Sequence, residues 1–87
     1  MKEFPLVRGG TAVVVQSGIE HAVVESSLVS PPGSTLELQL LGVLGLKVRS
    51  CKRIAETEPV RYRIEGRWIS LSRAQREALG IAHPGAV

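Results

Sequence analysis

The chain has 87 residues, a formal net charge of +3, one cysteine, 44% hydrophobic residues and 3% aromatic residues. A chain of this length forms one domain with one modest core, because it buries only about 60% of its unfolded surface. Its apolar content excludes a disordered chain, and no apolar run approaches the ~18 residues of a membrane helix. We therefore expect a single domain over residues 1–87 with no membrane span.

The compartment is predicted from the first residues and from the cysteine. Residues 1–5 lack the apolar segment of a signal peptide, and the single Cys51 excludes an internal disulfide. Both features favour a cytoplasmic domain. The net charge suits an anionic partner, although solubility alone also explains a charge of this size.

The first part of the chain predicts a leader followed by a hairpin. Residues 1–10 are expected to form an irregular leader, because Pro5 and the Gly9-Gly10 pair interrupt strand pairing. Residues 11–16 and 20–26 contain consecutive valines and predict two antiparallel strands joined by a short turn.

The middle of the chain predicts three more strands. The strongest turn signal is Ser30-Pro31-Pro32-Gly33-Ser34. Three runs of alternating apolar and polar residues follow this turn, with a polar loop over residues 54–59 between the second and the third. The side chains expected to face the core are Leu36, Leu38 and Leu40 in the first run, Leu44, Leu46 and Val48 in the second, and Val60, Tyr62 and Ile64 in the third.

Gly66 lies within the last of these strands. A glycine there predicts a bulge, which would shift the apolar phase to Trp68, Ile69 and Leu71.

A short helix is predicted to follow the strands. Ser72 and Gln75 have the spacing of a capping box, and Gly80 suits a left-handed C-terminal cap. A helix of about two turns is not stable alone, so it should dock through Leu71, Leu79 and Ile81. A flexible tail is expected over residues 81–87. The predicted fold is a mainly β, small antiparallel barrel of about five or six strands, with this one short C-terminal helix.

The end of the chain resembles the PilZ domain family. The resemblance is carried by residues 61–79, RYRIEGRWISLSRAQREAL, which match the strand, aromatic-apolar pair, Leu-Ser step and short helix that close PilZ domains. The Pro-Gly-Ser step at residues 32–34 also matches the entry into the third PilZ strand. The resemblance implies a bacterial six-stranded barrel and, in many members, a receptor for cyclic di-GMP.

The cyclic di-GMP motifs of that family are incomplete in this sequence. The family pattern has two arginines four residues apart before the first strand, but Arg8 has Phe4 and Ala12 at that spacing. The second motif aligns with Glu25, Ser27 and Ser30, where Ser30 replaces a glycine. We therefore expect weak or absent cyclic di-GMP binding, no other cofactor, and an adaptor role through protein contacts in motility or pilus pathways, as a monomer or homodimer. The alternative is a genuine cyclic di-GMP receptor that uses Arg8, Glu25 and Ser27.

Two surface features are candidates for partner binding. Leu41 and Val43 are out of phase with the inward leucines, which predicts an exposed apolar patch. The outward positions of the long hairpin are basic, which suits an acidic protein, single-stranded nucleic acid as a second alternative, or simply a solvated face. The basic positions are Lys47, Arg49, Lys52, Arg53, Arg61, Arg63 and Arg67.

The sequence contains no pattern that indicates catalysis or metal binding. Trp68 is interpreted either as a core residue or as a partially exposed partner anchor. His21 and His83 have no cysteine pair at metal-ligand spacing, Cys51 is interpreted as structural, and Glu25 with Ser27 lacks a base to complete a catalytic relay. We therefore expect a binding domain that is not an enzyme and holds no metal.

Overall fold

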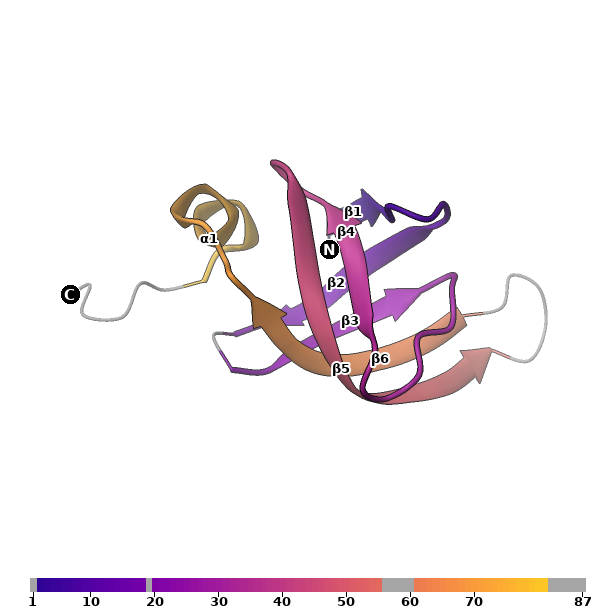
Figure 1. Ribbon diagram of the computed structural model, residues 1–87. Helices are drawn as coiled ribbons and strands as arrows, with labels where there is room; N and C mark the ends of the chain where they lie inside the picture. The colour runs from indigo at the N-terminus through magenta and orange to yellow at the C-terminus, as the bar shows by residue number, and fades with distance from the viewer. Residues whose placement is uncertain (1, 19, 56–60, 82–87) are drawn as a thin grey trace.

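The computed structural model describes residues 2–18, 20–55 and 61–81 of the chain. Six antiparallel strands precede one helix, and together they form the mainly β barrel expected from the sequence (Figure 1). The strands are β1 (Lys2–Pro5), β2 (Thr11–Ser17), β3 (Ala22–Ser26), β4 (Thr35–Gln39), β5 (Val43–Ala55) and β6 (Arg61–Ile69), and the helix is α1 (Arg73–Leu79).

The strands follow the order β1-β2-β3-β6-β5-β4 in one sheet, which is a Greek-key arrangement because β6 returns to lie beside β3. The sheet curls so that β1 approaches β4. A bridge between Leu6 and Leu38 and a hydrogen bond from the Val7 amide to the Glu37 carbonyl (3.0 Å) join these two edges. We call this junction the seam, and it makes the barrel nearly closed.

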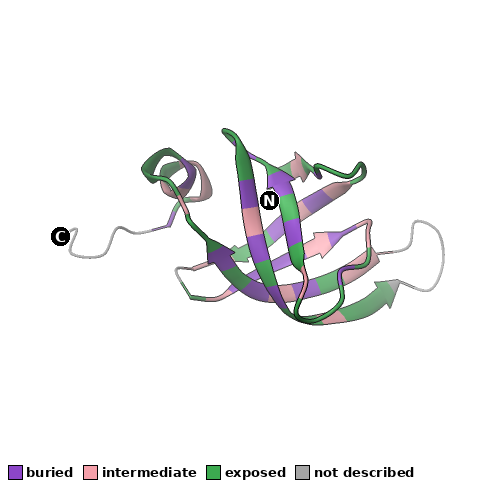
Figure 2. Cartoon of the chain, in the orientation of Figure 1, coloured by how far each residue is buried: buried purple, intermediate pink, exposed green. Residues whose placement is uncertain are grey.

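The core lies inside the curled sheet and follows the predicted alternation (Figure 2). In β4 and β5 the inward leucines and Val48 are buried, while the intervening side chains are exposed or half-buried. The alternation predicted for this part of the chain is therefore confirmed. The largest fully buried side chains are Leu38, Leu44, Leu46, Ile64, Val24 and Ser26.

The N-terminal leader is not irregular, which corrects the expectation for residues 1–10. Residues Lys2–Pro5 form β1 and pair with β2 from Lys2↔Val14 to Pro5↔Thr11. Pro5 is tolerated because it stands at the end of the strand, and Gly9 and Gly10 form the following turn with φ angles of 100° and 83°. Without β1, β2 would be an open edge and the seam would not exist.

The predicted bulge is real but lies on the other strand. The register of β5 and β6 shifts between Val48 and Ser50, opposite Gly66 and Glu65, so the extra residue is Arg49 in β5. The apolar phase of β6 therefore does not change. Trp68 stays inward with Ile64, whereas Ile69 is 39% exposed. Gly66 is required because β5 passes very close to it.

The helix ends are those predicted from the sequence. The Gln75 amide donates to Ser72 Oγ (3.1 Å), the Ser72 amide donates to Gln75 Oε1 (3.0 Å), and Gly80 is left-handed with φ 74°. Leu71 and Leu79 pack against the core, as predicted for docking. Ile81 is buried, so the tail does not begin there, and residues 82–87 lie outside the described residues.

One docking contact of the helix was not predicted. Gln75 is the buried residue of α1, and its Nε2 donates to the Leu40 carbonyl (2.8 Å) beside the β4–β5 turn. The same side chain therefore caps the helix and attaches it to the end of the barrel. Within the described ranges, no helix has the length and apolar character needed to cross a membrane.

Candidate functional site

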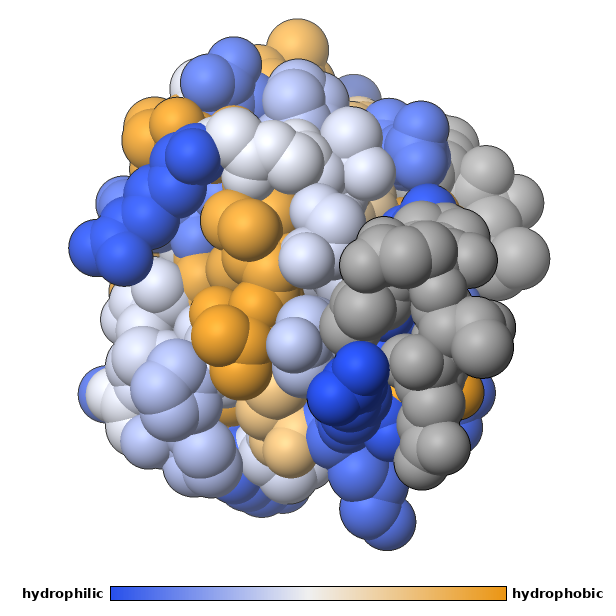
Figure 3. Space-filling view, turned by 90° about the vertical axis from the view of Figure 1, so that its right-hand side faces the viewer, coloured by the Kyte–Doolittle hydropathy of each residue, from blue (hydrophilic) through white to orange (hydrophobic). Residues whose placement is uncertain are grey.

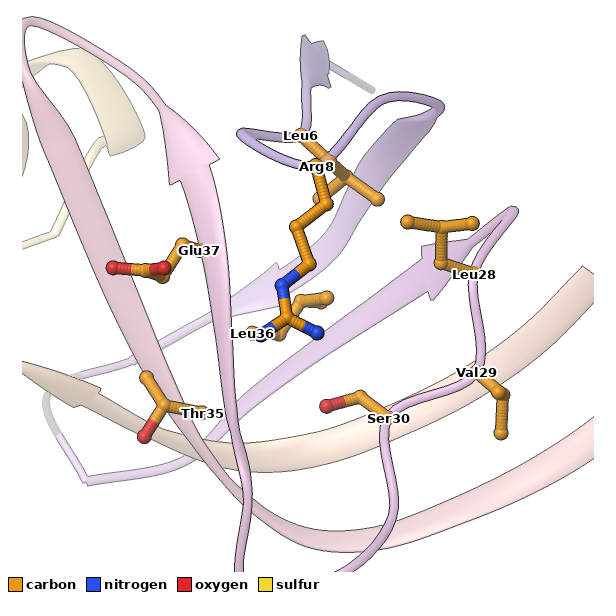
Figure 4. Close-up of a pocket in the computed structure, with 8 residues that line it drawn as sticks. All are labelled: Leu6, Arg8, Leu28, Val29, Ser30, Thr35, Leu36 and Glu37. Atoms are coloured by element: carbon orange, nitrogen blue, oxygen red, sulfur yellow. The ribbon is translucent and has the colours of Figure 1, made fainter.

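A pocket of about 250 Å³ lies beside the seam, at the end of the barrel opposite α1 (Figures 1 and 4). Three segments build it: the turn after β1, the connection between β3 and β4, and β4 itself. Seen from that end, hydrophobic side chains gather in the middle of the surface with hydrophilic side chains around them (Figure 3). The pocket is lined by Leu6, Arg8, Leu28, Val29, Ser30, Thr35, Leu36 and Glu37.

The lining of this end pocket is half apolar and half polar, with a single cation. The Arg8 side chain extends into it from the β1–β2 turn, and Glu37 lies on the opposite side (Figure 4). Ser30 is buried, and its hydroxyl forms a hydrogen bond with Ser34 Oγ (2.7 Å). A ligand would therefore meet one guanidinium, and a serine that already has a partner.

The end pocket brings together two of the four residues predicted for nucleotide binding. Arg8 and Ser30 line it. Ser27 instead accepts a hydrogen bond from the Thr11 amide (3.0 Å) and packs against Gly10. Glu25 faces outward from β3, where Arg63 Nη2 lies 3.6 Å from its Oε2. Glu25 and Ser27 thus do not line the end pocket, and each contacts a different strand of the barrel.

The turn between β4 and β5 carries exposed apolar side chains, as predicted. Leu41 is 67% exposed and Val43 is 59% exposed. Leu41 adopts a left-handed conformation with φ 50°, and Gly42 follows with φ 101°. A branched residue with such a backbone costs about 1 kcal/mol or more. A shallow hollow of about 450 Å³ beside this turn is lined by Pro5, Gln39, Leu40, Leu41, Gly42 and Val43.

The outer face of β5 and β6 is basic, and the register places like charges opposite each other. Lys47 pairs with Arg67 and Lys52 pairs with Arg63, while Arg49 is exposed in the bulge between them. Arg61, also predicted to bind a partner, is half-buried, and its Nη1 is enclosed without a hydrogen-bond partner among the described residues.

Trp68 is a core residue, so its core interpretation is confirmed and its assignment to a partner-binding surface is wrong. The indole is only 5% exposed, and its Nε1 donates to Ser17 Oγ (3.0 Å). The chain's other two aromatic side chains, Phe4 and Tyr62, are half-buried. Barrels that bind single-stranded nucleic acid stack bases on exposed aromatic rings, so this surface lacks the usual stacking platform.

Two features of these sites were not predicted. The end pocket depends on the contact of β1 with β4, and no local pattern in the sequence predicts that contact. The phase shift predicted at Gly66 would place Ile69 with the inward residues, but Ile69 lies on the outer face opposite Gly45, close to the β4–β5 turn. The position of Ile69 could have been found by continuing the alternation of β6 through Gly66 without a shift.

Groups that support metal chemistry are not gathered in the described part of the chain. No three side chains of His, Cys, Asp or Glu come together there. His21 Nε2 lies 3.1 Å from Glu65 Oε1 on the outer face, Cys51 is a half-buried free cysteine, and His83 is outside the described residues.

Comparisons with known proteins do not add a family to this description. Protein-family models, curated proteins and solved structures were all compared with the chain, and none matches it.

Proposed function

We propose that this chain is a PilZ-like adaptor domain of bacterial cyclic di-GMP-linked signalling, which acts by binding another protein and binds the nucleotide weakly or not at all. The observation that carries the proposal is the exposed apolar turn at Leu41 and Val43. Leu41 adds nothing to the core at 67% exposure, yet it occupies a strained backbone position that glycine or asparagine would occupy at lower cost. A partner that covers this turn explains why a leucine stands there.

Weak nucleotide binding is supported by the end pocket. Its volume of about 250 Å³ lies below the ~300–1,000 Å³ typical of small-molecule sites, and a cyclic dinucleotide is a large ligand. Arg8 is its single arginine, and each missing charge-assisted hydrogen bond costs about 1.5–3 kcal/mol, or roughly ten- to a hundredfold in affinity.

We further propose that the domain works in the cytoplasm and is not an enzyme. A free cysteine such as Cys51 is typical of a reducing compartment. The polar side chains at the end pocket include no nucleophile with an adjacent base, since Ser30 contacts another serine.

The adaptor role predicts a site-specific contact at the β4–β5 turn. A photo-crosslinking amino acid in place of Leu41, introduced into the chain in its native cell, should give one discrete protein adduct on illumination. The same amino acid in place of Val15 should give none, because Val15 is exposed on β2, which β3 and β6 separate from β5. Equal labelling from both positions, or no adduct from position 41, would contradict the proposal.

A second candidate function is a genuine cyclic di-GMP receptor, which is favoured by the presence of Arg8 and Ser30 in one pocket. Calorimetric titration of the domain with cyclic di-GMP distinguishes the two. The adaptor proposal predicts a dissociation constant weaker than about 1 μM, corresponding to less than about 8 kcal/mol of binding free energy. Submicromolar binding that is lost in Arg8→Ala would instead establish the receptor; binding that Arg8→Ala leaves unchanged would not occur in the end pocket.

A further inference from the structure

The outer face of β5 and β6 divides into an apolar end and a basic end, which we call together the docking strip. The apolar end carries Leu41, Val43 and Ile69, with Gly45 opposite Ile69 adding no side chain between the strands. The basic end continues along the same two strands and consists of Lys47, Arg67, Arg49, Lys52 and Arg63. One carboxylate, that of Glu65, lies among them on the same face and contacts His21.

The basic end is unfavourable for the isolated domain. Lys47 lies directly opposite Arg67, and Lys52 lies directly opposite Arg63. Side chains directly opposite on one face of an antiparallel pair have Cβ atoms about 4.5–5.5 Å apart, and like charges at that distance repel. An acidic residue at either member of a pair would remove this repulsion.

The charges of the strip are only partly neutralised within the chain. Arg63 lies 3.6 Å from Glu25, and Lys47 Nζ donates to the Gly33 carbonyl (2.9 Å). Arg49, Lys52 and Arg67 form no ion pair with any residue within 2–18, 20–55 and 61–81. These three exposed guanidinium and ammonium groups are therefore available to an anionic partner.

We propose that the docking strip binds an acidic protein segment that begins with an apolar anchor. The anchor packs on Leu41 and Val43 beside the shallow hollow, and the acidic side chains lie over Lys47 and Arg67. Lys47 lies four residues after Val43 along β5, so the acidic group lies about 13 Å from the anchor. This inference rests on the proposed protein-binding function and adds the chemistry of the partner to it.

Charge decides between this occupant and two others. A second copy of the chain would bring two basic strips together in a symmetric dimer, because a two-fold interface apposes the same surface of each subunit. The phosphates of single-stranded nucleic acid would match the positive charge of the strip. Its bases, however, normally stack on exposed aromatic rings, and no aromatic ring is exposed on the strip. An acidic segment matches both ends of the strip.

Selection from random peptides tests the chemistry without a known partner. Displayed peptides of about 16 residues are long enough to cover the strip, and they are panned on the immobilised whole chain. We expect the enriched peptides to carry an apolar residue followed by acidic residues. Their affinities are then measured by fluorescence anisotropy for the wild type and for matched variants.

Arg67→Glu is the decisive variant. It creates an opposite-charge pair with Lys47, so it should raise the melting temperature by about 2–4 °C while weakening the selected peptide by about tenfold or more. Loss of binding in a protein that is more stable cannot be attributed to unfolding. Arg67→Lys should stay within about twofold of the wild type, because it keeps the charge.

The apolar end has its own pair of variants. Val43→Ser should weaken the peptide several-fold, whereas Val15→Ser, at an exposed valine on β2, should leave it unchanged. The inference is overturned if no peptide is enriched, if the enriched peptides lack acidic residues, if Arg67→Glu binds them normally, or if an oligothymidine binds the strip more tightly than they do. A crosslinked protein at Leu41 together with any of these results would leave the adaptor role standing and the acidic partner refuted.

Discussion

Gly66→Ala should destabilise this barrel more than the addition of a single methyl group at any other glycine within a strand. A Cβ at this position would lie 2.1 Å from the carbonyl oxygen of Lys47, 2.9 Å from its carbonyl carbon and 3.3 Å from Val48 Cα. All three atoms belong to the β5 backbone, so no side-chain rotation relieves the overlap. The strands would have to separate beside the bulge, where β5 and β6 share the longest pairing in the sheet.

We expect this substitution to cost about 3 kcal/mol or more, because overpacking costs 1–3 kcal/mol even where side chains can adjust. Small domains have only about 5–15 kcal/mol of stability to lose, and one of 87 residues lies near the lower limit. Urea unfolding followed by the fluorescence of Trp68 measures the effect directly, since this is the chain's single tryptophan and it is buried.

Gly45→Ala is the matched control on the neighbouring strand. Its added Cβ would meet Thr35 Cγ2 at 3.2 Å, Ile69 Cδ1 at 3.7 Å and Ile69 Cβ at 3.8 Å, and all three atoms belong to side chains. We expect a change within about 1 kcal/mol, because alanine also loses less entropy on folding than glycine. If Gly66→Ala unfolded at the same urea concentration as the wild type, the close approach of β5 to Gly66 would be incorrect.

The parts of the fold that the sequence predicted are those determined by local chemistry. The leucines of β4 alternate without interruption, and a strand with one buried face permits only one phase. The helix ends depend on Ser72, Gln75 and Gly80, which lie within one short segment. The exposure of Leu41 and Val43 followed from the same alternation, because both lie out of phase with the buried leucines.

The parts that could not be predicted depend on contacts between distant segments. Residues 2–5 become a strand because β2 and the seam are there to pair with them, and their own sequence contains a proline and two charges. Trp68 donates a hydrogen bond to Ser17, which lies 51 positions away in the sequence. The residues around Trp68 in the sequence were therefore compatible with either a core or a surface position. Gly66 predicted a bulge, but the pairing register of β5 and β6 decides which of the two strands carries the extra residue.

The contrast between local patterns and distant contacts also explains why only two of the four predicted nucleotide-binding residues line one pocket. Arg8 and Ser30 belong to different connections, and the seam brings them to one pocket. Glu25 lies within β3, where the two-residue period sends its side chain outward to Arg63. The alignment of a motif gives the order of residues, whereas the strand phase decides which of them can reach a ligand.

Leu38→Ala should produce the second large effect, because this residue closes the barrel as well as filling its core. Leu38 is fully buried, pairs with Leu44 in the hairpin, and forms the bridge to Leu6 across the seam. Truncating a buried leucine costs about 2–5 kcal/mol. We expect the upper part of this range, because the cavity would lie where few hydrogen bonds hold β1 against β4.

Leu38→Ala should increase local opening at the seam more than it increases opening elsewhere in the barrel. The Val7 amide donates to the Glu37 carbonyl across the seam, so its hydrogen exchange should accelerate more than that of amides between β5 and β6. Leu41→Ala, three residues away in the same hairpin, should change the free energy of unfolding by less than about 0.5 kcal/mol, because that leucine is mostly exposed. Equal losses from the two alanine variants would mean that the seam contributes little to stability. Faster exchange of the Val7 amide, without a matching change between β5 and β6, would instead show that Leu38 stabilises the seam, beside which Arg8 and Ser30 line one pocket.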